Sequence, residues 1–212
     1  MDAEAISVDI ELDSVILPGI LSMPPAAHGL VVFAHGSGSS RLSPRNAFMA
    51  EVIQGEGMGT LLFDLLTEEE DLIYDNRFDI ELIANRLLAA TDWLLERPEA
   101  AGLSLGYFGA STGAAAALKA AVHESRVRAI VSRGGRPDLA LDVLPRIRAA
   151  TLLIVGSLDT IVIDLNRHAY NRLQCEKRME IVPGASHLFE EPGTLEVAAR
   201  LAAAWFKEHL QP

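Results

Sequence analysis

The chain has 212 residues, half of them hydrophobic, and its 29 acidic side chains against 18 lysines and arginines give a formal net charge of −11. This length and apolar content predict a single domain, residues 1–212, with a sizeable core. The negative charge repels phosphate backbones, so we expect no nucleic-acid partner. The only cysteine, Cys175, excludes an internal disulfide and a cysteine-based metal cluster. The first five residues are acidic where a signal peptide is basic, and no apolar run reaches the roughly 20 residues of a membrane span, which predicts a cytoplasmic protein.

Apolar and polar residues alternate over 6–12 and 15–22, which predicts an antiparallel hairpin that turns at Asp13-Ser14. Beyond this hairpin, apolar runs of strand length alternate with amphipathic stretches of helix length. Besides one helix after Ser111, we expect strands at 30–34, 60–63, 105–110, 127–132, 151–155 and 178–182, and helices at 44–54, 78–96, 139–144, 165–173 and 194–210. This rhythm predicts an α/β fold, with a mostly parallel sheet of roughly eight strands and helices on both faces.

One segment between a predicted strand and a predicted helix, Gly109-Ala110-Ser111-Thr112-Gly113, has the form of a nucleophile elbow. In such a sharp turn of small residues, a serine is lifted off the end of its strand with its hydroxyl exposed. The amide that follows the serine points to where an oxyanion would form. Ser111 is therefore the predicted nucleophile, and the Thr112 amide is a predicted oxyanion donor.

A serine hydroxyl needs a base to remove its proton, and the base needs a carboxylate to orient it. His187 lies in the loop after the last predicted strand, where the carboxyl edge of a parallel sheet places catalytic groups. Asp159 follows the preceding strand at the same edge, although turns and helix caps also favour aspartate. Asp164 is a rival acid, but it has the position of an N-cap for the helix expected from Leu165. The remaining histidines, which lie on expected helices, at the wrong sheet edge or in a loop, are His28, His35, His123, His168 and His209.

The glycine-rich loop His35-Gly36-Ser37-Gly38 follows another predicted strand, and its backbone can turn an amide toward the elbow. The Ser37 N–H is the expected second oxyanion donor. A phosphate cradle is the weaker alternative, because the loop lacks the Gly-Lys-Ser/Thr ending of a P-loop and the full dinucleotide spacing. We expect His35 to orient this loop.

Ser111, Asp159 and His187 follow one another in the chain order of α/β-hydrolases. This order is accompanied by the elbow, by the His35 loop, and by the segments Gly156-Ser157-Leu158-Asp159 and Gly184-Ala185-Ser186-His187. With these features the chain resembles the α/β-hydrolase superfamily, and within it the dienelactone hydrolase-like group of small, lidless enzymes. The resemblance implies an eight-stranded hydrolase sheet and ester-type hydrolysis. Dienelactone hydrolases proper carry a cysteine at the elbow, whereas this chain has serine there, which favours a carboxylesterase-like activity.

Few residues separate Ser132 from Thr151, too few for a helical lid, so we expect an open site for a small or exposed ester. Arg133 and Arg136 lie at the catalytic edge of the predicted sheet. Their guanidinium groups could bind a substrate carboxylate or could pair with surface acids. We expect no role in the site for the acidic run 68–71, which we interpret as a solvated loop. We expect none for Tyr74 and Trp93 either, which we interpret as packing residues.

These residues together predict a serine hydrolase that cleaves carboxylic esters through an acyl-enzyme on Ser111, without a metal or an organic cofactor. Lactone or thioester hydrolysis by the same triad stays open, as does a non-catalytic binding module on a hydrolase scaffold. The expected partner is a small-molecule ester, and the protein could be a monomer or a homodimer.

Overall fold

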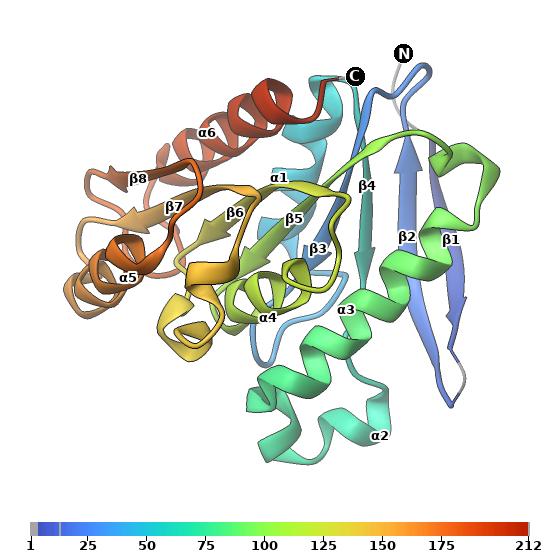
Figure 1. Ribbon diagram of the computed structural model, residues 1–212, viewed down its shortest axis with the longest axis horizontal. Helices are drawn as coiled ribbons and strands as arrows, with labels where there is room; N and C mark the ends of the chain where they lie inside the picture. The colour runs from blue at the N-terminus through green and yellow to red at the C-terminus, as the bar shows by residue number, and fades with distance from the viewer. Residues whose placement is uncertain (1–3, 13, 212) are drawn as a thin grey trace.

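The computed structural model describes residues 4–12 and 14–211 (Figure 1). Residue Asp13 of the expected hairpin turn, the first three residues of the acidic N-terminus and the last residue lie outside the described residues. Eight strands form one sheet in the order β1-β2-β4-β3-β5-β6-β7-β8. Their bounds are β1 Glu4–Glu11, β2 Ile16–Met23, β3 Gly29–Ala34, β4 Met58–Phe63, β5 Ser104–Ala110, β6 Val127–Arg133, β7 Ala150–Gly156 and β8 Lys177–Val182.

The first two strands pair antiparallel with each other, and β2 pairs antiparallel with β4. From β4 across to β8, every neighbouring pair runs parallel. The predicted hairpin and the predicted mostly parallel sheet of eight strands are therefore confirmed. Because the parallel strands share one direction, the loops that follow β3, β5, β7 and β8 meet at one edge of the sheet.

Helices cover both faces of the sheet, with α1 and α6 on one face and α3, α4 and α5 on the other (Figure 1). The helices are α1 Pro44–Gly55, α2 Glu68–Asp71, α3 Ile80–Leu95, α4 Thr112–Ala121, α5 Thr160–Arg172 and α6 Thr194–His209. On β3, Val31 and Phe33 pack against α1 and α6, whereas Leu30 and Val32 pack toward α3 and α4. Both faces of this strand are buried, which explains its continuous apolar run. Within the described part of the chain, none of the helices combines the length and apolarity that a membrane crossing needs.

Two predicted helices differ in the structure. The segment expected as a helix at 139–144 forms two 3-10 turns, η3 Pro137–Ala140 and η4 Leu144–Arg146. Pro145 explains the interruption, because proline has no N–H to donate and its ring collides with the preceding turn of an α-helix. The helix expected from Leu165 begins five residues earlier, at Thr160, so Asp164 lies inside α5 and is not its N-cap.

The surface segment between β4 and α3 also corrects the sequence analysis. The acidic run 68–71 is a helical turn, α2, closed by a capping box between Thr67 and Glu70. Tyr74, expected to pack, is 67% exposed on the 3-10 turn η1 Tyr74–Phe78. Trp93, in contrast, packs against the core on the α3 side, as predicted.

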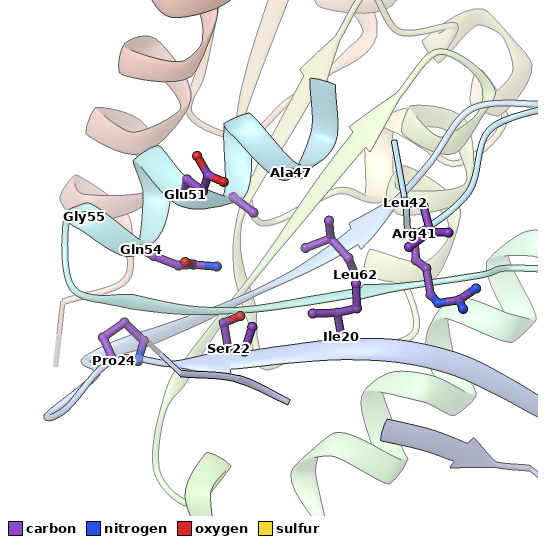
Figure 2. A pocket seen from close by; sticks show the side chains of 12 residues that line it. Ile20, Ser22, Pro24, Arg41, Leu42, Ala47, Glu51, Gln54, Gly55 and Leu62 are labelled. Carbon is purple, nitrogen blue, oxygen red and sulfur yellow. The ribbon is translucent and has the colours of Figure 1, made fainter. Parts of the chain in front are cut away.

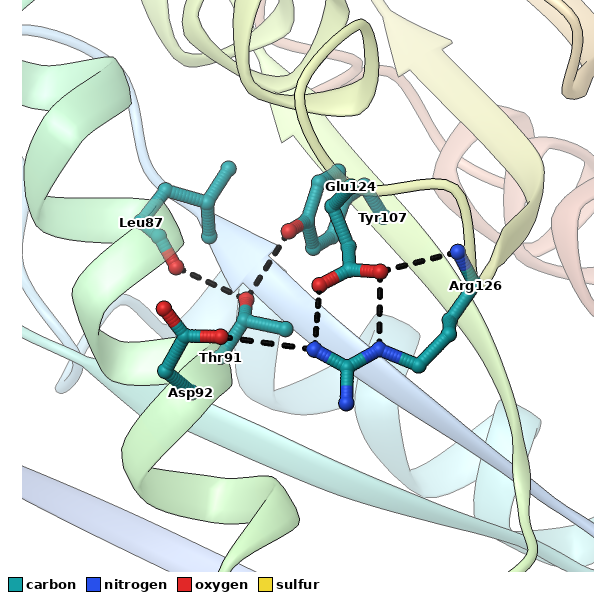
Figure 3. Close-up of polar contacts among 6 residues, drawn as sticks. All are labelled: Leu87, Thr91, Asp92, Tyr107, Glu124 and Arg126. Carbon is teal, nitrogen blue, oxygen red and sulfur yellow. Dashed lines mark hydrogen bonds and ion pairs between the residues drawn. The ribbon is translucent and has the colours of Figure 1, made fainter.

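A polar cluster ties α3 to β5 on the face away from α1 (Figure 3). Thr91 Oγ1 donates its one proton to the Leu87 carbonyl at 2.7 Å. The fully buried Tyr107 hydroxyl is therefore the donor in the 2.9 Å bond between Tyr107 and Thr91 Oγ1. Burial raises the pKa of Tyr107 above its ordinary range. Beside it, Glu124 accepts from the backbone and the guanidinium of Arg126. The cluster satisfies polar groups that would otherwise be buried without partners, and it fixes α3 on the sheet.

Candidate active site

Ser111 stands between β5 and α4 in the geometry of a nucleophile elbow. Its φ of 50° and ψ of −121° lie in a region that a residue with a side chain rarely adopts. Three backbone hydrogen bonds hold it there: its N–H donates to the Arg133 carbonyl at 3.3 Å, and its carbonyl accepts from Ala114 and Arg136 at 3.1 and 3.0 Å. The strained turn thus presents the side chain at the carboxyl edge of the sheet, as the pattern predicts.

The two glycines of the pattern are required by close packing. A Cβ on Gly109 would lie 2.4 Å from Cα of Ala114, in the first turn of α4. A Cβ on Gly113 would lie 2.1 Å from the carbonyl oxygen of Ala34, at the end of β3. The elbow can therefore form only where both positions lack a side chain.

His187 and Asp159 meet across two loops, as predicted. Nδ1 of His187 lies 2.6 Å from Oδ2 of Asp159, and the carboxylate side chain is only 15% exposed. Because the carboxylate accepts from Nδ1–H, the other ring nitrogen, Nε2, keeps its lone pair and can take a proton. The Asp159 and His187 loops are joined by further bonds, from the Leu158 N–H to the Ala185 carbonyl at 2.9 Å and from the Gly184 N–H to Ser157 Oγ at 2.8 Å.

The structure separates the two acids that the sequence offered. Asp159 has the N-cap position of α5 but makes no capping hydrogen bond, so its carboxylate is free to orient the imidazole. Asp164 is 77% exposed and pairs with Arg167 one turn along α5. Of the two acids, Asp159 is the one that contacts His187.

Ser111 and His187 line one cavity of about 230 Å³ at the carboxyl edge of the sheet. Its other walls come from the glycine-rich loop, the start of α1, the end of β6 and the His187 loop: Gly36, Ser37, Ser39, Ser43, Arg45, Asn46, Ala110, Arg133 and Leu188. The α1 residues of this wall were not predicted from the sequence. Their position directly after the glycine-rich loop was the available signal, because that loop ends at the same sheet edge.

The two expected oxyanion donors lie beside each other, but the Ser37 amide is engaged. Its N–H donates to Oγ1 of Thr112 at 2.9 Å, so in this structure it is not a free donor. The bond ties the glycine-rich loop to the elbow. Thr112 thus contributes a side chain that the sequence analysis did not consider, besides its backbone amide.

The His35 ring links the glycine-rich loop to the segment after β4. Its Nε2 accepts from the Leu65 N–H at 3.1 Å, which leaves Nδ1 protonated to donate to the Gly36 carbonyl at 2.9 Å. Burial lowers the pKa of His35 below its ordinary value of 6.5, so the ring is neutral at neutral pH. A neutral ring with this tautomer satisfies both neighbours.

The two arginines that the sequence offered as carboxylate ligands have different surroundings. Arg136 forms a two-pronged ion pair with Asp138, with both N–O distances at 2.8 Å, and does not line the cavity. Arg133 lines the cavity, and its closest hydrogen-bond partner among the described residues is the amide oxygen of Asn46 at 3.4 Å. An ion pair with an acid was the alternative role for both arginines, and among the described residues only Arg136 forms one.

A larger cavity, of about 670 Å³, lies between α1 and the β2 and β4 strands (Figure 2). Its polar side chains include Ser22, Glu51 and Gln54, and Gln54 donates to Thr60 Oγ1 at 2.7 Å. It contains no residue of the triad and no histidine, so the smaller cavity is the candidate active site.

One group of side chains could hold a metal ion in the described part of the chain. Donor atoms of Glu176, Glu208 and His209 lie within 4.8 Å of one another, and both glutamates are exposed. The group belongs to the start of β8 and the end of α6, away from the triad. Cys175, beside it in sequence, bonds weakly to Thr151 at the amino end of β7, far from the elbow.

Comparisons with known proteins agree with this fold. The model of the dienelactone hydrolase family matches residues 46–210. A crystal structure of dienelactone hydrolase from Anabaena variabilis ATCC 29413 is 52% identical, covers the whole of both chains and has a TM-score of 0.96. Est1E from Butyrivibrio proteoclasticus is 15% identical over 95% of this chain and 98% of its own, with a TM-score of 0.82, and shares the fold.

A further relative carries a different name. A "Putative phosphoribosyl transferase" of Mycobacterium tuberculosis, found in two strains, is 55% identical over 204 residues, which is 96% of this chain. The chain spans less than half, 46%, of the length of that relative.

Proposed function

Because this chain belongs to the dienelactone hydrolase family, we propose that it is a serine hydrolase that cleaves small carboxylic esters with the triad Ser111, His187 and Asp159. The observation that carries the proposal is the 2.6 Å contact between His187 and Asp159 at the cavity that Ser111 also lines. A nucleophile, a base and an orienting acid are the groups that acyl transfer requires.

In the first step, Nε2 of His187 takes the Ser111 proton while Oγ attacks the ester carbonyl. Asp159 keeps the imidazole in the tautomer that accepts this proton and stabilises the imidazolium that forms. His187 then protonates the leaving alcohol, and an acyl group remains on Ser111. Water, activated by the same imidazole, releases the acid and restores the serine.

The oxyanion of each tetrahedral intermediate needs donors that are already in place. The Thr112 amide begins α4 beside the nucleophile and serves this role. The Ser37 amide becomes the second donor when the negatively charged oxyanion replaces the neutral Thr112 hydroxyl as its acceptor, because charged acceptors form hydrogen bonds about twice as strong. No step in this scheme uses a metal or an organic cofactor.

The transferase name does not change the proposal. It belongs to a relative of which this chain covers 46%, while the part of the chain that matches the hydrolase family is residues 46–210. Lactones and thioesters undergo the same acyl transfer, and they stay alternatives to carboxylic esters. A binding module without activity would have no use for a base oriented at 2.6 Å beside a strained serine.

Replacement of the nucleophile tests the proposal. Ser111→Ala should abolish hydrolysis of p-nitrophenyl acyl esters and leave the circular dichroism spectrum unchanged, since alanine fits the same turn. A panel of acyl chain lengths, lactones and thioesters then ranks the substrates. Retained turnover by the folded Ser111→Ala protein would refute the assignment of the nucleophile.

A further inference from the structure

We propose that Arg133 forms an anion subsite beside the nucleophile, so that the preferred substrate is a small ester carrying a carboxylate or phosphate group. The inference rests on the proposed esterase function and names the substrate class for it. Its basis is a guanidinium in the active-site cavity that has no counter-charge among the described residues.

Burial of Arg133 is nearly complete. The residue is 7% exposed, and its Nε and Nη1 atoms have no hydrogen-bond partner in the described part of the chain. Nη2 reaches only the neutral Asn46 oxygen at 3.4 Å. Burial lowers the pKa of Arg133 to about 10, so the side chain still carries its charge at neutral pH.

The charges around Arg133 increase the need for an anion. Arg45 lines the same cavity, and its positive charge repels that of Arg133. Arg45 forms an ion pair with Glu190 at 3.3 Å on the surface. Of the two arginines that line the cavity, Arg133 is therefore the one without an acidic partner among the described residues. A buried charge without a partner is strongly unfavourable, whereas an anion bound beside the guanidinium in the cavity would compensate it.

The surroundings hold the guanidinium in place. It lies 5.8 Å from the ring centroid of Phe189, in the range of a cation–π contact. Phe189 adopts a φ of 57°, a left-handed conformation that is unfavourable for an aromatic residue. The start of α1, with its Ser43 cap and Asn46, borders the same cavity and adds the partial positive charge of a helix N-terminus.

Arg133 is also close to the reacting group. Its Cα is the register partner of Ala110, the residue before the nucleophile, and its carbonyl accepts from the Ser111 N–H. A cavity of about 230 Å³ admits a small molecule whose ester carbonyl faces Ser111 and whose anionic group faces Arg133. The subsite therefore selects among esters by charge.

Anion binding can be measured without catalysis. The melting temperatures of the wild type and of Ser111→Ala should rise with millimolar glutarate or inorganic phosphate, and the larger rise identifies the preferred anion. Arg133→Met should lose this rise, and the control Arg136→Met should keep it because Asp138 already occupies that guanidinium. No rise in the wild type, or an equal rise in Arg133→Met, would overturn the proposal.

Kinetics test the same subsite through two esters of equal chain length, the mono-p-nitrophenyl ester of glutaric acid and p-nitrophenyl pentanoate. We expect kcat/KM to favour the anionic ester by about tenfold or more in the wild type, and this ratio to fall by about tenfold or more in Arg133→Met. Arg133→Lys, which keeps the charge in the same place, should retain part of the preference. A wild type that hydrolyses the neutral ester without preferring the anionic one would refute the subsite alone. A wild type that hydrolyses neither, although it folds, would refute the esterase.

Discussion

Asp159→Asn changes one atom of the triad and leaves its shape intact. In the wild type the carboxylate accepts from Nδ1 of His187 at 2.6 Å and is 15% exposed, so little water shares the contact. An asparagine amide can donate to Nδ1 instead and thereby place the proton on Nε2, where it blocks the base. We expect kcat to fall by about 10³- to 10⁴-fold, which corresponds to about 4 to 5.5 kcal/mol of transition-state stabilisation.

Stability should hardly change in this variant. Asp159 has the N-cap position of α5, and asparagine is as favourable as aspartate at an N-cap. The assay is steady-state hydrolysis of a p-nitrophenyl ester, together with thermal unfolding. The matched control is Asp164→Asn, five residues along the same segment, whose side chain is 77% exposed and pairs only with Arg167 among the described residues. The reasoning is refuted if Asp159→Asn keeps kcat within about tenfold of the wild type, or if Asp164→Asn loses as much.

The remaining predictions concern the glycine-rich loop. Burial lowers the pKa of His35 below 6.5, so the unfolded chain binds a proton there that the folded chain does not. The free energy of unfolding that the neutral ring contributes is fully present above pH 6.5 and is lost as the pH falls through and below that value. The loss has a slope of at most about 1.4 kcal/mol per pH unit. Urea unfolding at several pH values should therefore show a shallower acid loss in His35→Gln, while the exposed control His168→Gln matches the wild type; equal slopes in all three would contradict this. Thr112→Val removes the acceptor of the Ser37 amide, and we expect kcat/KM to fall about three- to tenfold as the loop loosens, with Thr112→Ser losing less. An increase in Thr112→Val would contradict this expectation, because it would show that breaking the bond costs more than the order it gives the loop.

The mostly parallel sheet of eight strands, and the sheet edge at which the candidate triad residues lie, could be predicted because each depends on local pattern. Fully buried parallel strands are continuous apolar runs, and the residues that follow them must gather at one edge. Ser111 and Asp159 follow two such runs, β5 and β7, whereas His187 follows β8, an edge strand that is only partly buried. The structure brings Asp159 and His187 into contact and all three residues to neighbouring loops.

Features that depend on tertiary contacts could not be predicted. The first turn of α5 contains Ile161, Val162 and Ile163, which are weak helix formers, and Val162 and Ile163 pack against Val155 of β7. Their packing, rather than their propensity, starts the helix at Thr160.

Arg133 and Arg136 illustrate the same limit in the site. Arg133 is the last residue of β6 and Arg136 lies three residues after it, and nothing in the sequence distinguishes their charges. Asp138 lies two residues after Arg136 and binds it, whereas the fold turns Arg133 toward Asn46 and Phe189. Only the three-dimensional surroundings show which guanidinium lacks a counter-charge among the described residues.

Covalent labelling of Ser111 tests the central claim most directly. A fluorophosphonate probe reacts with a serine only where a base activates its hydroxyl and an oxyanion hole receives the phosphoryl oxygen. We predict that intact-mass analysis shows one adduct on the wild type, that peptide mapping places it on Ser111, and that His187→Ala, with its fold preserved, reacts far more slowly. An unlabelled wild-type protein, or an adduct on another serine, would contradict the account.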